Sequence, residues 1–147
     1  GLESELLGRF RYQENEALLH TDPRFMPKTR RCWASWNYRI EAGGKAHSTH
    51  YWMNELQGVS ELEQYFVSIN PSSRPAGEFI KRRLVYEHPL FDLEAVAAQD
   101  RLPALHAAGD ETRRYFCGAW QRYGFHEDGL WSAVNVCAQI LGRDPWR

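Results

Sequence analysis

The sequence has few cysteines, no long apolar run and no excess of charge of either sign. Its three cysteines are an odd number and lack C-x-x-C spacing, which argues against a disulfide framework and a zinc knuckle. No apolar stretch approaches the roughly 20 residues of a transmembrane helix, and the first ten residues lack the basic-then-apolar order of a secretory signal. We expect a cytoplasmic protein that is soluble or peripheral to the membrane, without a transmembrane segment.

The charge balance argues against a nucleic-acid partner. The 18 basic and 19 acidic side chains leave a net charge of -1, whereas a nucleic-acid binder usually carries a clear positive excess. Lys28, Arg30 and Arg31 form one short basic cluster, and residues 81–83 form another. Such short clusters are typical of a solvated rim, with an anionic substrate or membrane headgroups as the alternative. We expect no nucleic-acid partner.

Aromatic and apolar residues are abundant. Of the 147 residues, 43% are hydrophobic and 14% are aromatic, which is enough for one real core. Alternating and β-branched segments predict an antiparallel meander with a tight hairpin turn at Gly43 and Gly44. The predicted strands are Cys32–Ile40, His47–Asn54, Glu63–Ile69 and Lys81–Glu87, after a pair of extended segments in Phe10–Thr21 around a polar turn at Gln13–Glu16.

Helices are predicted on both sides of this meander. Residues 3–8 indicate the end of a helix, with Gly8 as a left-handed cap. The Ala-rich stretch Leu93–Leu102 predicts a second helix that Asp92 begins and Pro103 closes.

The last part of the chain predicts a strand, a turn and a helix. Arg114–Ala119 is a compact apolar run of the buried-strand type, which would pack Cys117 in the interior. Leu130–Leu141 has helical spacing, and Gly142 can cap it. A buried strand, a glycine-containing turn and the free N–H groups of a helix's first turn can together cradle a phosphate or a polarised ring oxygen.

The histidines do not predict a metal site. His47 and His50 are three apart on a predicted strand, so their side chains point to opposite faces. His20 and Asp22 match a catalytic triad only by residue type, since no G-x-S-x-G motif accompanies them. A histidine that is hydrogen-bonded beside a turn is the favoured interpretation of His20.

Five aromatic residues recur in the first two meander strands: Trp33, Trp36, Tyr38, Tyr51 and Trp52. Such residues favour a sheet core. The alternative is a pocket in which Trp36, Tyr38 and Tyr51 contact a flat or long apolar substrate.

Together, the stretches LHTDPRFMP, ASWNY, THYWMNELQ, HPLFD and YFCGAWQRYGFHEDGL carry a family resemblance over nearly the whole chain. The chain resembles the C-terminal portion of predicted NAD/FAD-binding proteins of the flavin-containing amine oxidase superfamily, in a bacterial subgroup associated with cyclopropane fatty-acid synthases. The resemblance implies that Gly118 lets FAD approach, that Phe125 faces the isoalloxazine and that the backbone at His126 meets a ring oxygen. The implied FAD-binding residues are Gly118, Gly124, Phe125, His126, Glu127, Asp128, Gly129 and Leu130.

Two departures from the family pattern concern the FAD site. Many members place one acidic residue before the glycine of the helix start, whereas here Glu127 and Asp128 both precede Gly129, so either can fill that role. The family also holds the ADP half of FAD with an N-terminal G-x-G-x-x-G, which this sequence lacks. We therefore expect the partner of this fragment to be an N-terminal FAD domain of the same protein, without which the fragment is inactive.

These observations predict an α+β fold, with an antiparallel sheet layer and a C-terminal strand-helix unit of an FAD-binding domain whose N-terminal part is absent. Residues 1–108 would form a substrate-side β region with short helices, and residues 109–147 the closing strand and helix of the FAD-binding domain. The resemblance implies an FAD-dependent oxidoreductase that oxidises an amine or a lipid acyl substrate by hydride transfer to flavin.

The residues assign no catalytic base, and His20, Tyr38 and His50 are the candidates. One alternative is a stand-alone, non-catalytic module that binds an apolar ligand on its aromatic-rich sheet. The other is an interaction domain that dimerises through exposed aromatic strands. Self-association of the fragment is expected in any case, because removal from a larger protein exposes covered apolar surface.

Overall fold

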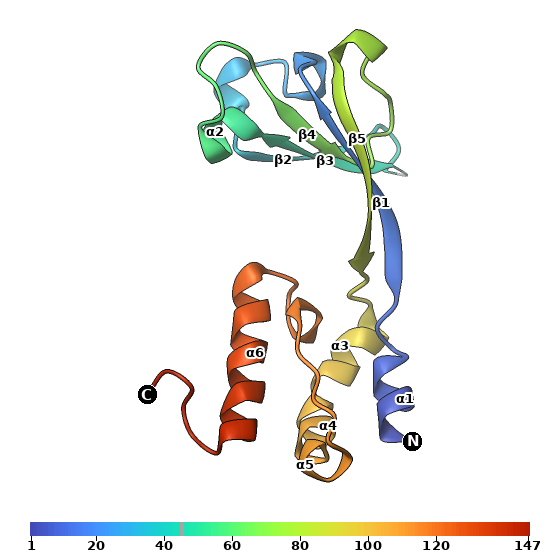
Figure 1. Cartoon of the computed structure of the whole chain (residues 1–147). Helices are drawn as coiled ribbons and strands as arrows, with labels where there is room; N and C mark the ends of the chain where they lie inside the picture. Colours follow the sequence, from blue (N-terminus) through green and yellow to red (C-terminus); the bar gives the residue numbers. More distant parts are fainter. Residues whose placement is uncertain (45) are drawn as a thin grey trace. The chain divides into compact units, whose positions relative to one another are not determined.

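The computed structural model describes residues 1–44 and 46–147 and groups them into two compact units (Figure 1). Unit 1 comprises residues 1–13 and 88–147, and unit 2 comprises residues 14–87. The chain passes from one unit to the other within strands β1 (Tyr12–His20) and β5 (Ile80–Pro89). The two units therefore divide within these strands, after residues 13 and 87. The assignment of residues 109–147 to an FAD-binding domain stays a prediction.

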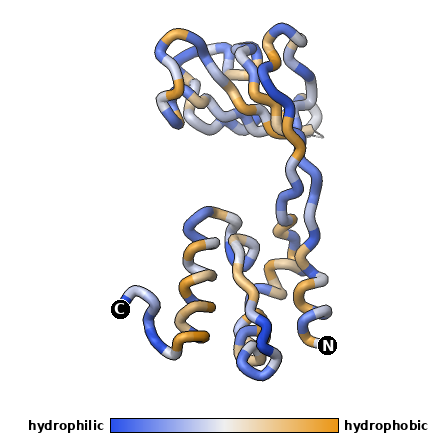
Figure 2. Tube along the Cα trace, in the orientation of Figure 1, coloured by the Kyte–Doolittle hydropathy of each residue, from blue (hydrophilic) through white to orange (hydrophobic). Residues whose placement is uncertain are grey.

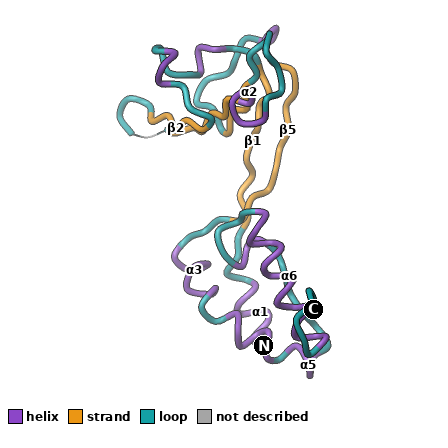
Figure 3. Tube along the Cα trace, turned by 90° about the vertical axis from the view of Figure 1, so that its left-hand side faces the viewer, coloured by secondary structure: helices purple, strands orange, loops and turns teal. Residues whose placement is uncertain are grey.

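The strands form one five-stranded antiparallel sheet in the order β2-β3-β4-β1-β5, in which β1 and β5 run side by side (Figure 3). The other strands are β2 (Trp36–Ile40), β3 (His47–Trp52) and β4 (Phe66–Ile69). Positive φ angles at Gly43 and Gly44, 90° and 68°, turn the chain between β2 and β3. The predicted α+β class and the β2–β3 hairpin are thus confirmed.

Several predicted strand bounds are wrong. The strand predicted to end at Asn54 ends at Trp52, because residues 53–57 are helical, and the strand predicted from Glu63 begins at Phe66. β1 is one continuous strand, not two segments around a turn at Gln13–Glu16. It pairs with β4 from Ala17 to His20 and with β5 on its other side, and this pairing outweighs the local turn preference of the polar residues. The strand predicted from Cys32 begins only at Trp36, because residues 30–32 form a 3₁₀ turn.

The remaining elements are short, except for the last helix. Unit 2 adds the helix α2 (Met53–Gln57) and the 3₁₀ turns η1 (Pro23–Phe25), η2 (Arg30–Cys32) and η3 (Gly77–Phe79). Unit 1 contains α1 (Leu2–Leu7), α3 (Leu93–Gln99), α4 (Leu102–Ala107), α5 (Gly109–Thr112), η4 (Ala119–Gln121) and α6 (His126–Leu141).

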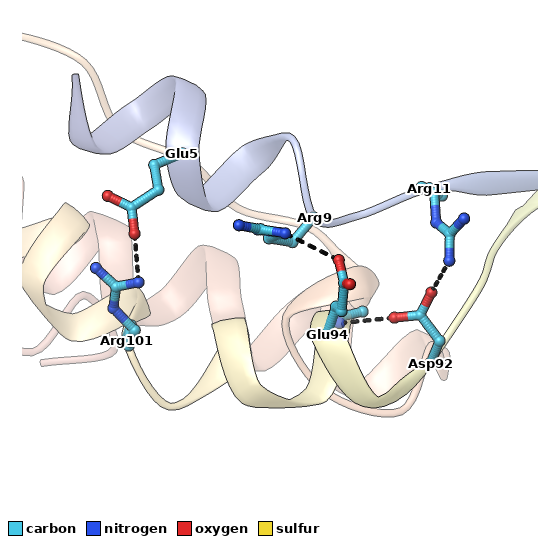
Figure 4. Close-up of polar contacts among 7 residues, drawn as sticks. Glu5, Arg9, Arg11, Asp92, Glu94 and Arg101 are labelled. Atoms are coloured by element: carbon cyan, nitrogen blue, oxygen red, sulfur yellow. Dashed lines mark hydrogen bonds and ion pairs between the residues drawn. The ribbon is translucent and has the colours of Figure 1, made fainter.

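Unit 1 has a small core of buried side chains: Leu6, Ala98, Leu102 and Leu105. As predicted, Asp92 caps α3, since its Oδ1 accepts a hydrogen bond of 2.9 Å from the N–H of Ala95. Exposed ion pairs join α1 and the following residues to the α3 region: Arg9–Glu94, Arg11–Asp92 and Glu5–Arg101 (Figure 4). Such pairs add little stability each, so the apolar contacts hold this unit together.

Two predicted helix ends differ in the structure. Helix α3 ends at Gln99, and Pro103 lies in the first turn of α4 instead of closing α3. Proline is tolerated there because first-turn N–H groups have no partner within the helix. Gly8 ends α1 with a φ of -66°, so the predicted left-handed cap is wrong at this position.

The predicted buried strand at Arg114–Ala119 is wrong. Residues 114–117 are irregular, and Ala119 already belongs to η4. The prediction that Cys117 is packed is also wrong, because this cysteine is exposed. An extended segment needs a neighbouring strand to pair its backbone groups. The described part of unit 1 offers none beside residues 114–117.

Candidate functional site

The turn that leads into α6 is built around Gly118. Its φ is 147°, and a Cβ placed there would lie 2.5 Å from Nε1 of Trp120. Its N–H donates to Oγ of buried Ser132 at 2.8 Å, and that hydroxyl donates to the carbonyl of Gly129 at 2.8 Å. Gly118 is therefore required by the protein's own packing, and it is fixed to the first turns of α6.

Asp128, rather than Glu127, organises the start of α6. Asp128 is buried, and its Oδ2 accepts hydrogen bonds from the N–H groups of Tyr123 at 3.2 Å and Phe125 at 3.0 Å. The Arg122 guanidinium lies 3.6 Å from its other oxygen. Glu127 is exposed. Of the two acidic residues, Asp128 thus shapes the turn, whereas Glu127 remains on the surface.

The first turn of α6 presents unused donors beside exposed apolar groups. Within residues 1–44 and 46–147, the N–H groups of His126 and Glu127 donate to no protein acceptor, and they lie at the positive end of a 16-residue helix. Phe125 and Leu130 are 69% and 51% exposed. Free donors next to an exposed aromatic ring fit the polar edge of a flavin ring and its flat face.

The two other predicted glycines differ in their surroundings. Gly124 has a φ of 89°, and a Cβ there would lie 3.2 Å from the ring of Phe91, so the turn itself calls for glycine. At Gly129, the nearest atoms to a Cβ would be those of Ala119, at 3.8 Å, which is ordinary contact. Nothing in unit 1 therefore requires glycine at position 129.

Helix α6 is rich in apolar residues, as the colouring of its later turns in Figure 2 indicates. No charged residue occurs from Leu130 to Leu141, yet only Asp128 and Ser132 of the helix are buried. The exposed large side chains are Leu130, Trp131, Ile140 and Leu141. Large apolar side chains that stay exposed together mark a surface that another part of a protein can cover. α6 thus has more apolar surface than unit 1 covers.

In unit 2, the inward face of the sheet holds a polar cluster. His20, Ser48, His50 and Ser68 are all buried. Ser68 lies directly opposite His50 in the β3–β4 register, and Phe66 lies opposite His20. Cross-strand neighbours on one face lie close together, so residues that are far apart in the sequence meet beneath the rings of Phe25 and Phe66.

The hydrogen bonds in this cluster have one consistent direction. The N–H of Asp22 donates to Nδ1 of His20 at 3.2 Å, so the proton of the neutral His20 ring is on Nε2. Nε2 then donates to Ser68 Oγ at 2.7 Å. The single hydroxyl hydrogen of Ser68 is left for Nδ1 of His50, also at 2.7 Å. Nε2 of His50 in turn donates to Ser48 Oγ at 2.9 Å.

Burial keeps both imidazoles neutral. Desolvation lowers the pKa of His20 from about 6.5 to about 4, partly opposed by the carboxylate of Asp22. Desolvation, followed by the charge of Arg39, lowers the pKa of His50 to about 4. The carboxylate of Asp22 binds Arg24, whose Nε lies at 2.8 Å from Oδ1, and this bond lowers the pKa of Asp22. The hydrogen-bonded chain His20–Ser68–His50–Ser48, here named the relay, is thus made of neutral side chains at pH 7.

The structure divides the aromatic residues of the meander between two faces. Trp33 and Trp52 pack at right angles on the inward face, 5.4 Å apart. Trp36 and Tyr38, 55% and 49% exposed, stack on each other with ring centroids 6.2 Å apart on the outward face. Tyr51 pairs with Trp36 across β2 and β3 and is partly exposed. The predicted substrate residues Trp36, Tyr38 and Tyr51 are therefore brought together.

The three candidate bases are not brought together. His20 and His50 share the inward relay, whereas Tyr38 stacks with Trp36 on the outward face. The prediction that His20 is a hydrogen-bonded histidine beside a turn is confirmed. Sequence reasoning missed Ser48 and Ser68, although the alternation around His50 and Phe66 places both serines on the inward face.

No group of three or more metal-ligating side chains occurs in the described part of the chain. Among the same residues, no helix combines the length and apolar character that crossing a membrane requires.

Comparison with known proteins gives no assignment: no family model matches the chain, and no curated protein matches it.

Proposed function

We propose that this chain is the C-terminal part of an FAD-dependent oxidoreductase. The observation that carries the proposal is the start of α6, where two N–H groups without an acceptor among the described residues lie beside the exposed ring of Phe125. The fragment GFHEDG, which carries the family resemblance, forms this helix start. In this proposal, His126 and Glu127 offer backbone donors to the polar edge of the flavin, and Phe125 lies against its ring.

The apolar surface of α6 supports an N-terminal FAD domain of the same protein as the partner of unit 1. Covering Leu130, Trp131 and Ile140 would remove large apolar areas from water, at about 25 cal/mol per Å². Without that domain, the same surface would favour self-association of the fragment.

The outward face of the sheet in unit 2 supports a substrate-side role. Trp36, Tyr38 and Tyr51 form a contiguous, partly exposed aromatic surface, which suits an apolar amine or a lipid acyl chain. A bound flavin would supply hydride acceptance. The residues of this chain would bind and orient the substrate and exclude water from it.

The first test is the absorbance spectrum of the purified full-length gene product. A flavin band, with release of FAD on denaturation, is the expected result. A protein without bound flavin that also fails to bind added FAD would overturn the proposal.

A variant pair then tests the helix start. His126→Pro removes one free N–H at the first position of α6, where proline is tolerated and where the preceding Phe125 is already extended. His126→Ala keeps the N–H and removes only the imidazole. We expect roughly a tenfold weaker FAD affinity in the proline variant, the cost of about one lost hydrogen bond, and little change in the alanine variant. Equal affinities would contradict the role of this donor.

A second candidate is a non-catalytic module that binds an apolar ligand on its sheet. The exposure of Trp36, Tyr38 and Ile40 on the edge strand β2 favours it. The absorbance experiment separates the two candidates, since a module would bind no flavin and would still bind apolar ligands.

A further inference from the structure

A pocket of about 330 Å³ lies in unit 2, between residues 24–28 and the strand β2, and buried His50 forms part of its wall. Phe25, Met26 and Pro27 give it an apolar lining. Three cations also line it: Arg24, Lys28 and Arg39. No acidic side chain is among the described residues that line it. The pocket thus combines apolar walls with positive charge.

One of these positive charges is uncompensated. Arg24 pairs with buried Asp22 at 2.6 Å, and Arg39 pairs with Glu41 at 3.0 Å. Lys28 makes no ion pair with any residue that the structure describes. A ligand with one negative charge would therefore balance the pocket.

The polar groups of the pocket also favour a ligand that accepts hydrogen bonds. Arg24 and Arg39 use Nε and Nη2 in their ion pairs, and the Nη1 groups of both have no acceptor in the described part of the chain. The acceptors, in contrast, are occupied. Oδ1 of Asn37 accepts from the N–H of Ala34 at 3.2 Å, and both ring nitrogens of His50 are bound to serines.

We propose that this pocket binds a monocarboxylate with a short apolar chain, with its carboxylate on Lys28 and its chain on Phe25, Met26 and Pro27. The volume lies at the small end of the range for ligand sites, ~300–1,000 Å³, which suits a medium-length chain. One uncompensated charge favours a carboxylate over a phosphate, which carries a charge of about -1.5 to -2 at pH 7. The site uses no residue of the α6 turn, so it stands independently of the proposed flavin site.

Calorimetric titration of the full-length gene product with octanoate tests this proposal. We expect saturable binding of octanoate and much weaker binding of octanol and octylamine, which lack the negative charge. Tighter binding of octyl phosphate than of octanoate would overturn the carboxylate assignment. Equal binding of octanol would overturn the role of charge.

Two lysine variants test the role of Lys28, with Lys81 as the matched control. Lys28→Ala should weaken octanoate binding about tenfold, the effect of one charge-assisted hydrogen bond. Lys81→Ala should leave it unchanged, because Lys81 does not line the pocket and pairs with Glu63 at 3.6 Å. Both variants remove a surface lysine, so neither should impair folding. Octanoate should also protect Lys28, but not Lys81, from acetylation as read by mass spectrometry. No octanoate binding, or equal effects of the two variants, would refute the site.

Discussion

The hydroxyl oxygen of Ser68 lies 2.7 Å from Nδ1 of His50, its direct cross-strand neighbour in the sheet of unit 2. The same oxygen lies 2.7 Å from Nε2 of His20. One hydroxyl thus satisfies two buried imidazoles, as donor to one and acceptor from the other. The inward face of this sheet is held by directed hydrogen bonds as well as by apolar packing.

Replacing Ser68 with alanine should destabilise the protein by about 2–4 kcal/mol, because one buried nitrogen on each of two histidines loses its partner. Urea unfolding of the variant and the parent measures this difference. Ser72→Ala is the matched control, since exposed Ser72 bonds only to Glu41 in the described structure, and it should cost less than about 1 kcal/mol. Equal losses in the two variants would show that the relay adds nothing.

Stability should fall as the pH drops from about 6.5 to about 4, the ordinary and folded pKa values of His20 and His50. Above this window both imidazoles are neutral in the folded and unfolded chain, so their full contribution is present. Within it, only the unfolded chain binds the extra protons, which favours unfolding. Near pH 5 the loss should reach about 2 kcal/mol per histidine. Unfolding free energies measured across this range give the slope.

Two histidine variants identify the source of that slope. His47 is exposed on the other face of β3, so His47→Gln should leave the pH dependence unchanged. His50→Gln should remove about half of it, even if the variant is less stable at every pH. A parent curve that is flat between these pH values would rule out the depressed pKa values.

Replacing Gly118 with alanine should cost about 2–4 kcal/mol, because its positive φ is strained for any other residue and its Cβ would overlap the ring of Trp120. That ring is packed edge-on against Phe10, with centroids 4.5 Å apart, so it cannot move freely. Gly142→Ala separates the two causes: its φ is 64°, with no atom within 4 Å of the added Cβ. It should cost about 1 kcal/mol. Thermal unfolding of both variants provides the comparison.

Asp128→Ala should destabilise the start of α6 by about 1–2 kcal/mol, the usual cost of losing a helix cap. The N–H groups of Tyr123 and Phe125 would lose their acceptor and should exchange faster in hydrogen-exchange measurements. Glu127→Ala removes the neighbouring, exposed carboxylate and should stay within about 0.5 kcal/mol of the parent. A larger effect at Glu127 than at Asp128 would reverse the roles assigned to these residues.

Local patterns were sufficient for several elements. The Gly43-Gly44 turn between alternating segments predicted the β2–β3 hairpin, and Asp92 before an Ala-rich stretch predicted the start of α3. Helical spacing up to Gly142 predicted α6, although the helix begins four residues earlier, at His126. In each case the decisive interactions join residues that are close in the sequence, so a short stretch of sequence is enough to predict the element.

Other features depended on partners that are distant in the sequence. The apolar run Arg114–Ala119 resembles a buried strand, but a strand forms only where another strand pairs with it. β1 stays extended because it pairs with β4 and β5, which are distant in the sequence. The register also decided that Trp36 and Tyr38 face outward while Trp33 and Trp52 pack inward.

The sequence by itself thus determined the α+β class, the hairpin and the C-terminal helix, because backbone propensity, turn glycines and caps act locally. Only the tertiary structure decided that His20, His50 and Ser68 form one relay, that Asp128 rather than Glu127 holds the α6 turn, and that Lys28 lines a pocket with no ion-pair partner among the described residues. Burial, cross-strand register and charge pairing join residues that are far apart in the chain, and these relationships exist only once the chain has folded.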